Sequence, residues 1–160
     1  MHDRATVHKT AMTLQLKRIN YSDLNARQQE NHNFQKVSAV LADYGFATIR
    51  LTDDWQGADF IAQHIDGQTF LLVQLKGRFT LSAKYQEKGL YIAFPDNGTW
   101  YLYPHDVLLK QVLAESNMGA TQYWQQGRDH TPSSLTRQML RLLRPYRIIS
   151  TISPAQSGAA

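Results

Sequence analysis

The segment that most constrains the fold is residues 57–78, GADFIAQHIDGQTFLLVQLKGR, in which two apolar stretches flank the pair Asp66-Gly67. An Asp-Gly pair between apolar stretches is a strong signal for a two-residue hairpin turn. It predicts antiparallel strands over 58–65 and 68–76.

Three polar residues, Asp59, Gln74 and Lys76, interrupt this apolar hairpin. If Ile65 pairs with Gln68, Asp59 lies opposite Gln74, and the alternation of strand side chains puts all three on one face. Burying such groups unpaired costs several kcal/mol, roughly. One compensation is an Asp59–Lys76 ion pair with Gln74 hydrogen-bonded beside it. Another is a divalent cation such as Mg²⁺, which takes carboxylate and carbonyl oxygens and keeps several waters.

Upstream, Ser22 or Asp23 is expected to cap a helix that runs to Tyr44 and is closed by Gly45. The apolar residues of this segment are spaced by three and four, so they form one helical face. That face consists of Phe34, Val37, Leu41 and Tyr44. One turn further back the same face reaches Glu30, which could add a second carboxylate to the hairpin cluster, directly or through water.

The remaining pattern predicts a single α/β domain with a central mixed sheet of about five strands flanked by helices. Residues 1–20 are expected to be a flexible N-terminal segment and residues 150–160 a disordered tail, so the domain spans 21–149. The other predicted elements are strands over 46–52, 90–95 and 99–104, a loop over 53–57, a possible crossover helix within 79–89, a helix over 105–116, a loop over 117–131 and a last helix with a Ser cap over 132–146.

The net charge of +4 is concentrated near the C-terminus, because residues 119–160 contain five Arg and one Asp, whereas residues 1–118 contain twelve basic and twelve acidic residues. In the last helix Arg137, Arg141 and Arg144 share a face, and Arg147 follows. Such a face is typical of phosphate contact along a duplex. It is equally typical of an amphipathic helix that docks on the core with its arginines outward.

Several functional classes are excluded or disfavoured by composition. The chain has no cysteine, so it contains no disulfide, zinc–thiolate site or cysteine nucleophile. No run of 18 apolar residues and no secretory signal are found, so we expect no membrane association and a cytoplasmic location.

With these residues in place, the chain resembles the PD-(D/E)XK nuclease superfamily, which has the restriction-endonuclease-like fold. That pattern is an Asp on one strand, then an acidic residue, a spacer and a Lys on the next, often with a Glu from an upstream helix. Here GADF supplies Asp59 and VQLKGR supplies Gln74, Leu75 and Lys76, with Glu30 upstream. The resemblance covers roughly residues 22–116.

Within the superfamily the chain is most similar to small group I intron-type homing endonucleases, through the segment KGLYIAFPDNGTWYLYPHDVL after the motif. Gln74 departs from the usual acidic residue, although some members carry Gln there, and it is expected to lower metal affinity. The Pro of the motif's name is also absent.

The resemblance implies a metal-dependent DNA endonuclease that hydrolyses phosphodiester bonds with Mg²⁺, for which Mn²⁺ can substitute. Asp59 would be the central metal ligand, completed by Gln74 and the Leu75 carbonyl. Lys76 would position or activate water, and Glu30 would be an auxiliary ligand. Arg78 is an expected phosphate contact.

The implied partner is double-stranded DNA, cut by a homodimer that supplies one site for each strand. Two alternatives stay open on the residues alone. The first is a catalytically inactive nuclease fold that binds DNA or a partner, which Gln74 keeps possible. The second is a structural domain whose polar cluster is only an ion pair.

Overall fold

The computed structural model describes residues 15–150, and the predictions for residues 1–14 and 151–160 lie outside this range. One six-stranded sheet has its strands in sequence order, and all neighbours are antiparallel except the parallel pair β3 and β4. The strands are β1 (Phe46–Trp55), β2 (Ala58–His64), β3 (Phe70–Leu75), β4 (Leu90–Asp96), β5 (Thr99–Pro104) and β6 (Arg147–Ile148). The helices are α1 (Ala26–Ala42), α2 (His105–Glu115), α3 (Gln122–Gln125) and α4 (Arg137–Leu143).

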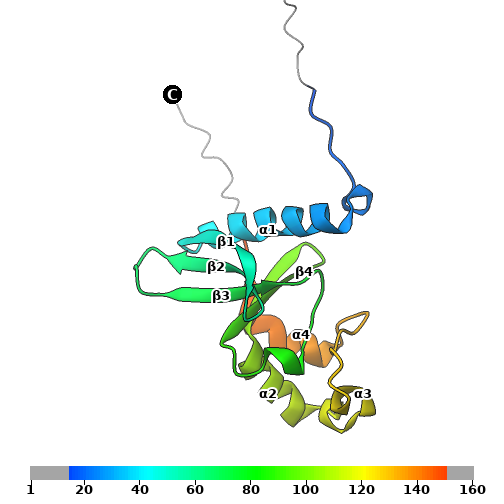
Figure 1. Ribbon diagram of the computed structural model, residues 1–160. Coiled ribbons are helices and arrows are strands. Elements are labelled where there is room, and N and C mark those ends of the chain that lie inside the picture. The colour runs from blue at the N-terminus through cyan, green and yellow to red at the C-terminus, as the bar shows by residue number, and fades with distance from the viewer. Residues whose placement is uncertain (1–14, 151–160) are drawn as a thin grey trace, which may run out of the picture.

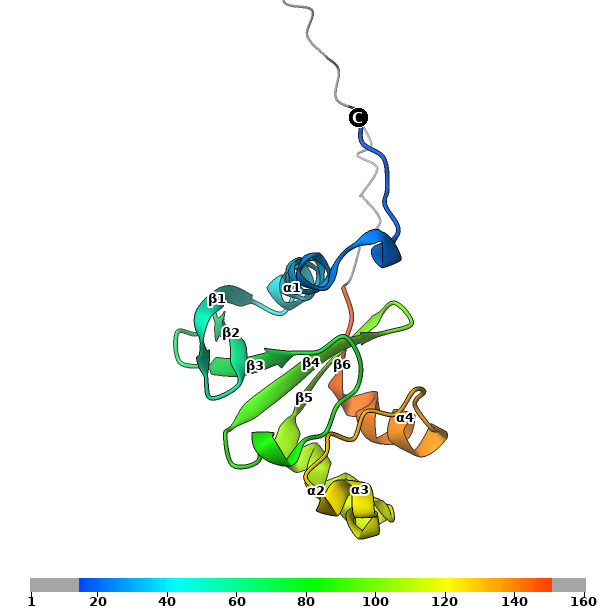
Figure 2. The ribbon, with the colours of Figure 1, turned by 45° about the vertical axis from the view of Figure 1, so that its right-hand side comes forward.

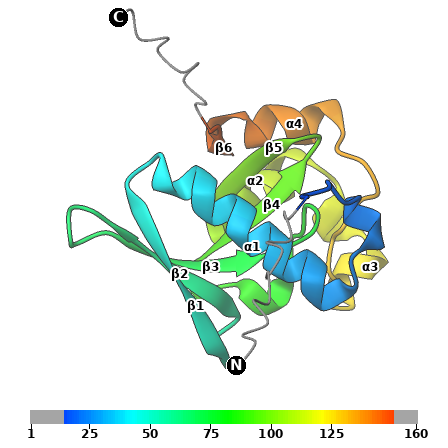
Figure 3. The same cartoon turned by 90° about the horizontal axis from the view of Figure 1, so that it is seen from above.

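Helices cover both faces of the sheet. Helix α1 runs across one face, and α2, α3 and α4 lie on the opposite side (Figures 1 and 2). In Figure 3 α1 is nearest the viewer, in front of the sheet. Two apolar clusters match these two layers. In one, Val37 and Leu41 of α1 pack with Phe60 and Val73 of the hairpin. In the other, residues of α2 and α4 pack on β4 and β5, and its largest fully buried members include Phe94, Tyr103, Leu108 and Leu143.

The predicted α/β class with a mixed sheet is therefore confirmed. Its strand count differs by one, because the two-residue strand β6 pairs with β5 at the sheet edge, where Trp100 faces Ile148 and Tyr101 faces Arg147. A two-residue strand leaves no alternation pattern in the sequence, so it could not be predicted.

The hairpin register is the predicted one, since Phe60 pairs with Val73 and Ile61 with Leu72. The register follows from the apolar alternation, because a shift by one residue would turn the side chains that meet α1 toward the opposite face.

The turn of the hairpin is longer than predicted. The strands end at His64 and Phe70, so Ile65 and Gln68 are not paired as strand residues. Instead the Asp66 carboxylate accepts hydrogen bonds from the backbone N–H groups of Gln68 and Thr69, both at 2.8 Å. This side chain organises a wider loop without changing the register.

Two helices begin at a cap residue other than the predicted one. Asn25, rather than Ser22 or Asp23, caps α1, and it exchanges hydrogen bonds with Gln28 in a capping box. The predicted terminator Gly45 does adopt a left-handed φ of 80° after the helix end. At the last helix, Thr136 is the cap in place of a Ser, so α4 is shorter than predicted and continues as a 3₁₀ turn over Arg144–Tyr146.

The segment between β3 and β4 crosses from one strand to its parallel neighbour. It contains a single 3₁₀ turn, Ala83–Tyr85, rather than a longer helix. The backbone of Leu81 exchanges two hydrogen bonds with His130, so this crossover is tied to the loop that precedes α4.

Candidate functional site

Asp59 lies where β2 and β3 diverge. The paired ladder between these strands ends at Phe60 and Val73, and beyond it β3 stays paired with β4. The Leu75 N–H therefore lacks a strand partner on the β2 side and donates to Oδ2 of Asp59 at 2.7 Å. The amide Nε2 of Gln74 donates to the same oxygen at 2.5 Å. The structure thus brings together Asp59 and Gln74, as the register predicts.

A wide bulge in β1 opens the space in front of Asp59. Arg50 pairs with Phe60, and the next pair is Trp55 with Ala58, so residues 51–54 face Asp59 alone. Residues 53–57 were expected to form a loop, but β1 extends to Trp55 and turns tightly into β2. Gln56 and Gly57 both have positive φ, of 55° and 93°, which is typical of a two-residue hairpin turn. Bulges of this kind commonly re-aim side chains next to functional sites.

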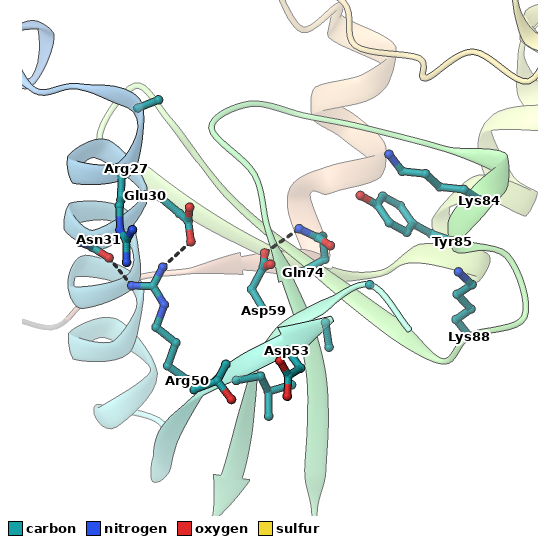
Figure 4. A pocket seen from close by; sticks show the side chains of 15 residues that line it. Arg27, Glu30, Asn31, Arg50, Asp53, Asp59, Gln74, Lys84, Tyr85 and Lys88 are labelled. Carbon is teal, nitrogen blue, oxygen red and sulfur yellow. Dashed lines mark hydrogen bonds and ion pairs between the residues drawn. The ribbon is translucent and has the colours of Figure 1, made fainter. Parts of the chain in front are cut away.

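The resulting pocket has a volume of about 1060 Å³. Figure 4 shows Asp59 and Gln74 between two groups of side chains, one from α1 and β1 and the other from the crossover segment. Burial raises the pKa of Asp59 above its ordinary value of 3.8, opposed by the hydrogen bond from Leu75 and reinforced by the negative charge of Glu30. A carboxylate in this environment is stabilised by a nearby cation.

Glu30 lines the same pocket, although it does not lie on the buried seam as predicted. The buried side of α1 consists of Asn33, Val37, Val40 and Leu41, whereas 51% of the Glu30 side chain is exposed. Its carboxylate forms an ion pair with Arg50, which also donates to Asn31 (Figure 4). Glu30 therefore faces Asp59 across the pocket with a basic residue already bound to it.

Lys76 is close to the pocket, and its ammonium is held otherwise than in the Asp59–Lys76 ion pair that the sequence left open as one explanation of the polar cluster. Within the described residues, no salt bridge joins Lys76 to Asp59. Its ammonium lies over the ring of Tyr85, with Nζ 5.3 Å from the ring centroid, and Lys84 Nζ lies 5.0 Å from the same centroid. The positive charge of Lys76 still lowers the pKa of Asp59, although less strongly than burial raises it. Lys76 and Arg78 line a second, smaller pocket of about 500 Å³.

The basic residues of the main pocket were missed by the sequence analysis. They are Arg27, Arg50, Lys84 and Lys88. The only signal in the sequence was the pair of lysines four residues apart before β4, and their role depends on how the crossover folds back toward Asp59.

The arginines near the C-terminus are not part of this pocket. Arg137, Arg144 and Arg147 are exposed, and Arg141 forms an ion pair with Glu115 of α2. Helix α4 lies on the side of the sheet opposite α1 (Figure 2).

The donors around Asp59 fit a hard divalent cation. The two hydrogen bonds that Asp59 accepts from Gln74 and Leu75 both reach Oδ2. Gln74 Nε2 also donates to the Leu75 carbonyl at 3.3 Å, so the amide must turn over before its oxygen can serve as a ligand beside Asp59 and the Leu75 carbonyl. Mg²⁺ needs only one or two carboxylates from a protein. The described residues contain no group of three or more His, Cys, Asp or Glu suited to a metal. The oxygen atoms around Asp59 therefore fit a cation that keeps much of its water, and they do not fit a coordination sphere made entirely of protein ligands.

Comparison with known proteins finds no matching family model and no matching curated protein. Several chains of solved structures are similar, and two of them are described here. One is Hjc, a Holliday junction resolvase from Archaeoglobus fulgidus, with 21% identity, a TM-score of 0.38, and 48% of this chain and 72% of that chain covered. The other is a bacterial homing endonuclease, with 14% identity, a TM-score of 0.46, and coverage of 77% and 86%. Both TM-scores lie below 0.5, so neither likeness says what this chain does.

Among the described residues, no helix combines the length and the apolar character needed to cross a membrane.

Proposed function

We propose that the chain is a metal-dependent DNA endonuclease that hydrolyses phosphodiester bonds. The observation that carries the proposal is the half-buried Asp59 carboxylate, whose pKa is raised by burial and which lies in an open pocket beside Gln74 and Leu75. A carboxylate with a perturbed pKa in a cleft is a recognised mark of a functional site. Asp59, Gln74 and Lys76 also match the spacing of the superfamily motif.

In this proposal Asp59, the Gln74 amide oxygen and the Leu75 carbonyl hold Mg²⁺ or Mn²⁺. The ion, when bound, supplies charge neutralisation at the phosphate and a more acidic water. Lys76 contributes an ammonium that orients water or stabilises negative charge on the reacting phosphate. Glu30 is an auxiliary ligand, acting directly or through water, and Arg50 holds its carboxylate at the pocket wall.

The partner is double-stranded DNA. One active site hydrolyses one DNA strand, so cutting both strands requires a second copy of the chain. We therefore propose a homodimer. Arg78, Arg137, Arg141, Arg144 and Arg147 remain predicted phosphate contacts. The proposed location is cytoplasmic and DNA-associated.

A plasmid-nicking assay with Mg²⁺ or Mn²⁺ tests the proposal. Asp59→Asn and Lys76→Ala should each abolish cutting that the wild type performs, because one removes the central anionic ligand and the other the ammonium. The matched controls are Asp96→Asn, at the β4–β5 turn, and Lys110→Ala, on the exposed side of α2. Cutting that persists in both site variants would refute the assignment of the site.

A second candidate is a catalytically inactive nuclease fold that binds DNA or a partner. It is favoured by one contact, the hydrogen bond from Gln74 Nε2 to Asp59, which satisfies the carboxylate without any cation. Duplex binding with no cutting under any divalent ion, unchanged in Asp59→Asn, would support this candidate over the first.

A further inference from the structure

Basic side chains flank the Asp59 pocket on two sides. Arg27 lies in the first turn of α1, and Lys84 and Lys88 lie on the crossover between β3 and β4. In Figure 4, Asp59 and Gln74 are between these two groups. A phosphodiester chain that places one phosphate at Asp59 has further phosphates on either side, which is where these cations lie.

These side chains are available for a ligand. Among the described residues, neither Arg27 nor Lys88 takes part in an ion pair. Lys84 forms an ion pair with Asp129, with 3.5 Å between Nζ and Oδ2, and 58% of its side chain remains exposed to a ligand. Arg50, the fourth basic residue of the pocket, is already bound to Glu30 and is therefore a weaker candidate.

The crossover that presents the two lysines is fixed by polar contacts to the helical layer. The Ser82 N–H donates to Nε2 of the fully buried His105 at 3.2 Å, and the Ser82 hydroxyl donates to Asp129 at 2.5 Å. Further along, the Glu87 N–H donates to Asp106 at 2.9 Å. A segment held at both ends keeps its lysines in place before a ligand arrives, which lowers the entropy lost on binding.

We infer that Lys84, Lys88 and Arg27 form the main phosphate-contacting surface of this protein for duplex DNA, ahead of the arginines of α4. The inference rests on the proposed function, because it takes the Asp59 pocket as the place where DNA is engaged. The C-terminal arginines are outside the lining of the Asp59 pocket, whereas Arg27, Lys84 and Lys88 are part of it.

The test compares two double variants that remove the same charge. Lys84→Gln with Lys88→Gln alters the crossover, and Arg137→Gln with Arg144→Gln alters the C-terminal arginines. Binding to a fluorescently labelled duplex is measured by anisotropy in EDTA, where no cutting occurs, between about 50 and 200 mM salt. Thermal melting of each variant checks that the fold is intact.

Each phosphate contact contributes about 0.9 to the slope of log affinity against log salt, so the crossover variant should lose roughly 2 from this slope, and on the order of tenfold in affinity. The variant at Arg137 and Arg144 should lose clearly less of the slope than the crossover variant. An unchanged slope in the crossover variant, a loss as large in the α4 variant, or a wild type that does not bind duplex would each overturn the inference. Because no metal is present, loss of cutting in the nicking assay leaves this result unaffected.

Discussion

The residue at position 74 decides how the site behaves without a cation. Gln74 Nε2 donates to Asp59 at 2.5 Å, in a half-buried place where burial already raises the pKa of Asp59. Gln74→Glu replaces this donor by a second carboxylate. The lost hydrogen bond to a charged acceptor is worth about 1.5–3 kcal/mol. Two unit charges about 4 Å apart repel by about 4 kcal/mol at an effective dielectric constant near 20.

These two contributions do not simply add, because partial exposure screens the charges and proton uptake relieves the repulsion. We therefore expect Gln74→Glu to lower the free energy of unfolding by about 2–4 kcal/mol in EDTA at mildly alkaline pH. Adding Mg²⁺ or Mn²⁺ should restore much of this, since a ligand at 100 times its Kd stabilises the folded state by about 2.7 kcal/mol. Lowering the pH should also restore it, because one proton can be shared between the two carboxylates.

Urea denaturation followed by circular dichroism, with and without divalent ions, measures both effects. Gln35→Glu, on the exposed side of α1, is the matched control for the change of amide to carboxylate. If Gln74→Glu is as stable as the wild type in EDTA, the Asp59–Gln74 contact is not formed. If divalent ions stabilise it no more than they stabilise Gln35→Glu, the pocket is not a cation site.

Two further predictions concern the pH dependence of stability and the placement of Lys76. Because burial raises the pKa of Asp59, the folded state binds a proton more tightly than the unfolded chain, so this group's unfavourable contribution is present above the folded pKa and is removed as the pH falls through it. The free energy of unfolding of Asp59→Asn, measured against pH, should lack the contribution from this carboxyl group. A pH profile identical to that of the wild type would contradict this prediction. The ring of Tyr85 lies under the ammonium groups of both Lys76 and Lys84, a contact worth about 0.5–1 kcal/mol at partly exposed sites. Tyr85→Leu should therefore lower kcat for nicking and shift its pH profile, whereas Tyr85→Phe should keep both. An equal loss in the two variants would exclude the ring as the positioning element.

The hairpin could be predicted from the sequence because two independent constraints agree. Phe60 and Val73 must face α1, and the Asp66-Gly67 pair places the turn between the strands. Their agreement fixes the register and hence the meeting of Asp59 with Gln74. The wider turn could not be predicted, since its shape depends on the Asp66 side chain accepting hydrogen bonds within the loop.

The rest of the pocket depends on tertiary structure. Nothing in residues 51–54 marks them as a bulge opposite Asp59, because a bulge is defined by the partner strand. The same holds for the ion pair of Glu30 with Arg50, whose members are on different elements. A helical period predicts which side of α1 is apolar, but it does not indicate which basic residue of β1 will reach Glu30.

Two features of the pocket reduce its negative charge relative to the superfamily pattern. Gln74 replaces an acidic residue, and Arg50 neutralises Glu30, so Asp59 is left as the one carboxylate of the predicted site without a basic partner at ion-pair distance within the described residues. Asp53 of β1 also lines the pocket, but of the predicted ligands only one unpaired carboxylate remains. One carboxylate binds Mg²⁺ weakly, because the ion gives up its water reluctantly and gains little charge compensation. A DNA phosphate at the pocket would supply the missing negative charge. Metal and DNA should therefore bind cooperatively, with each raising the affinity of the other by the same factor.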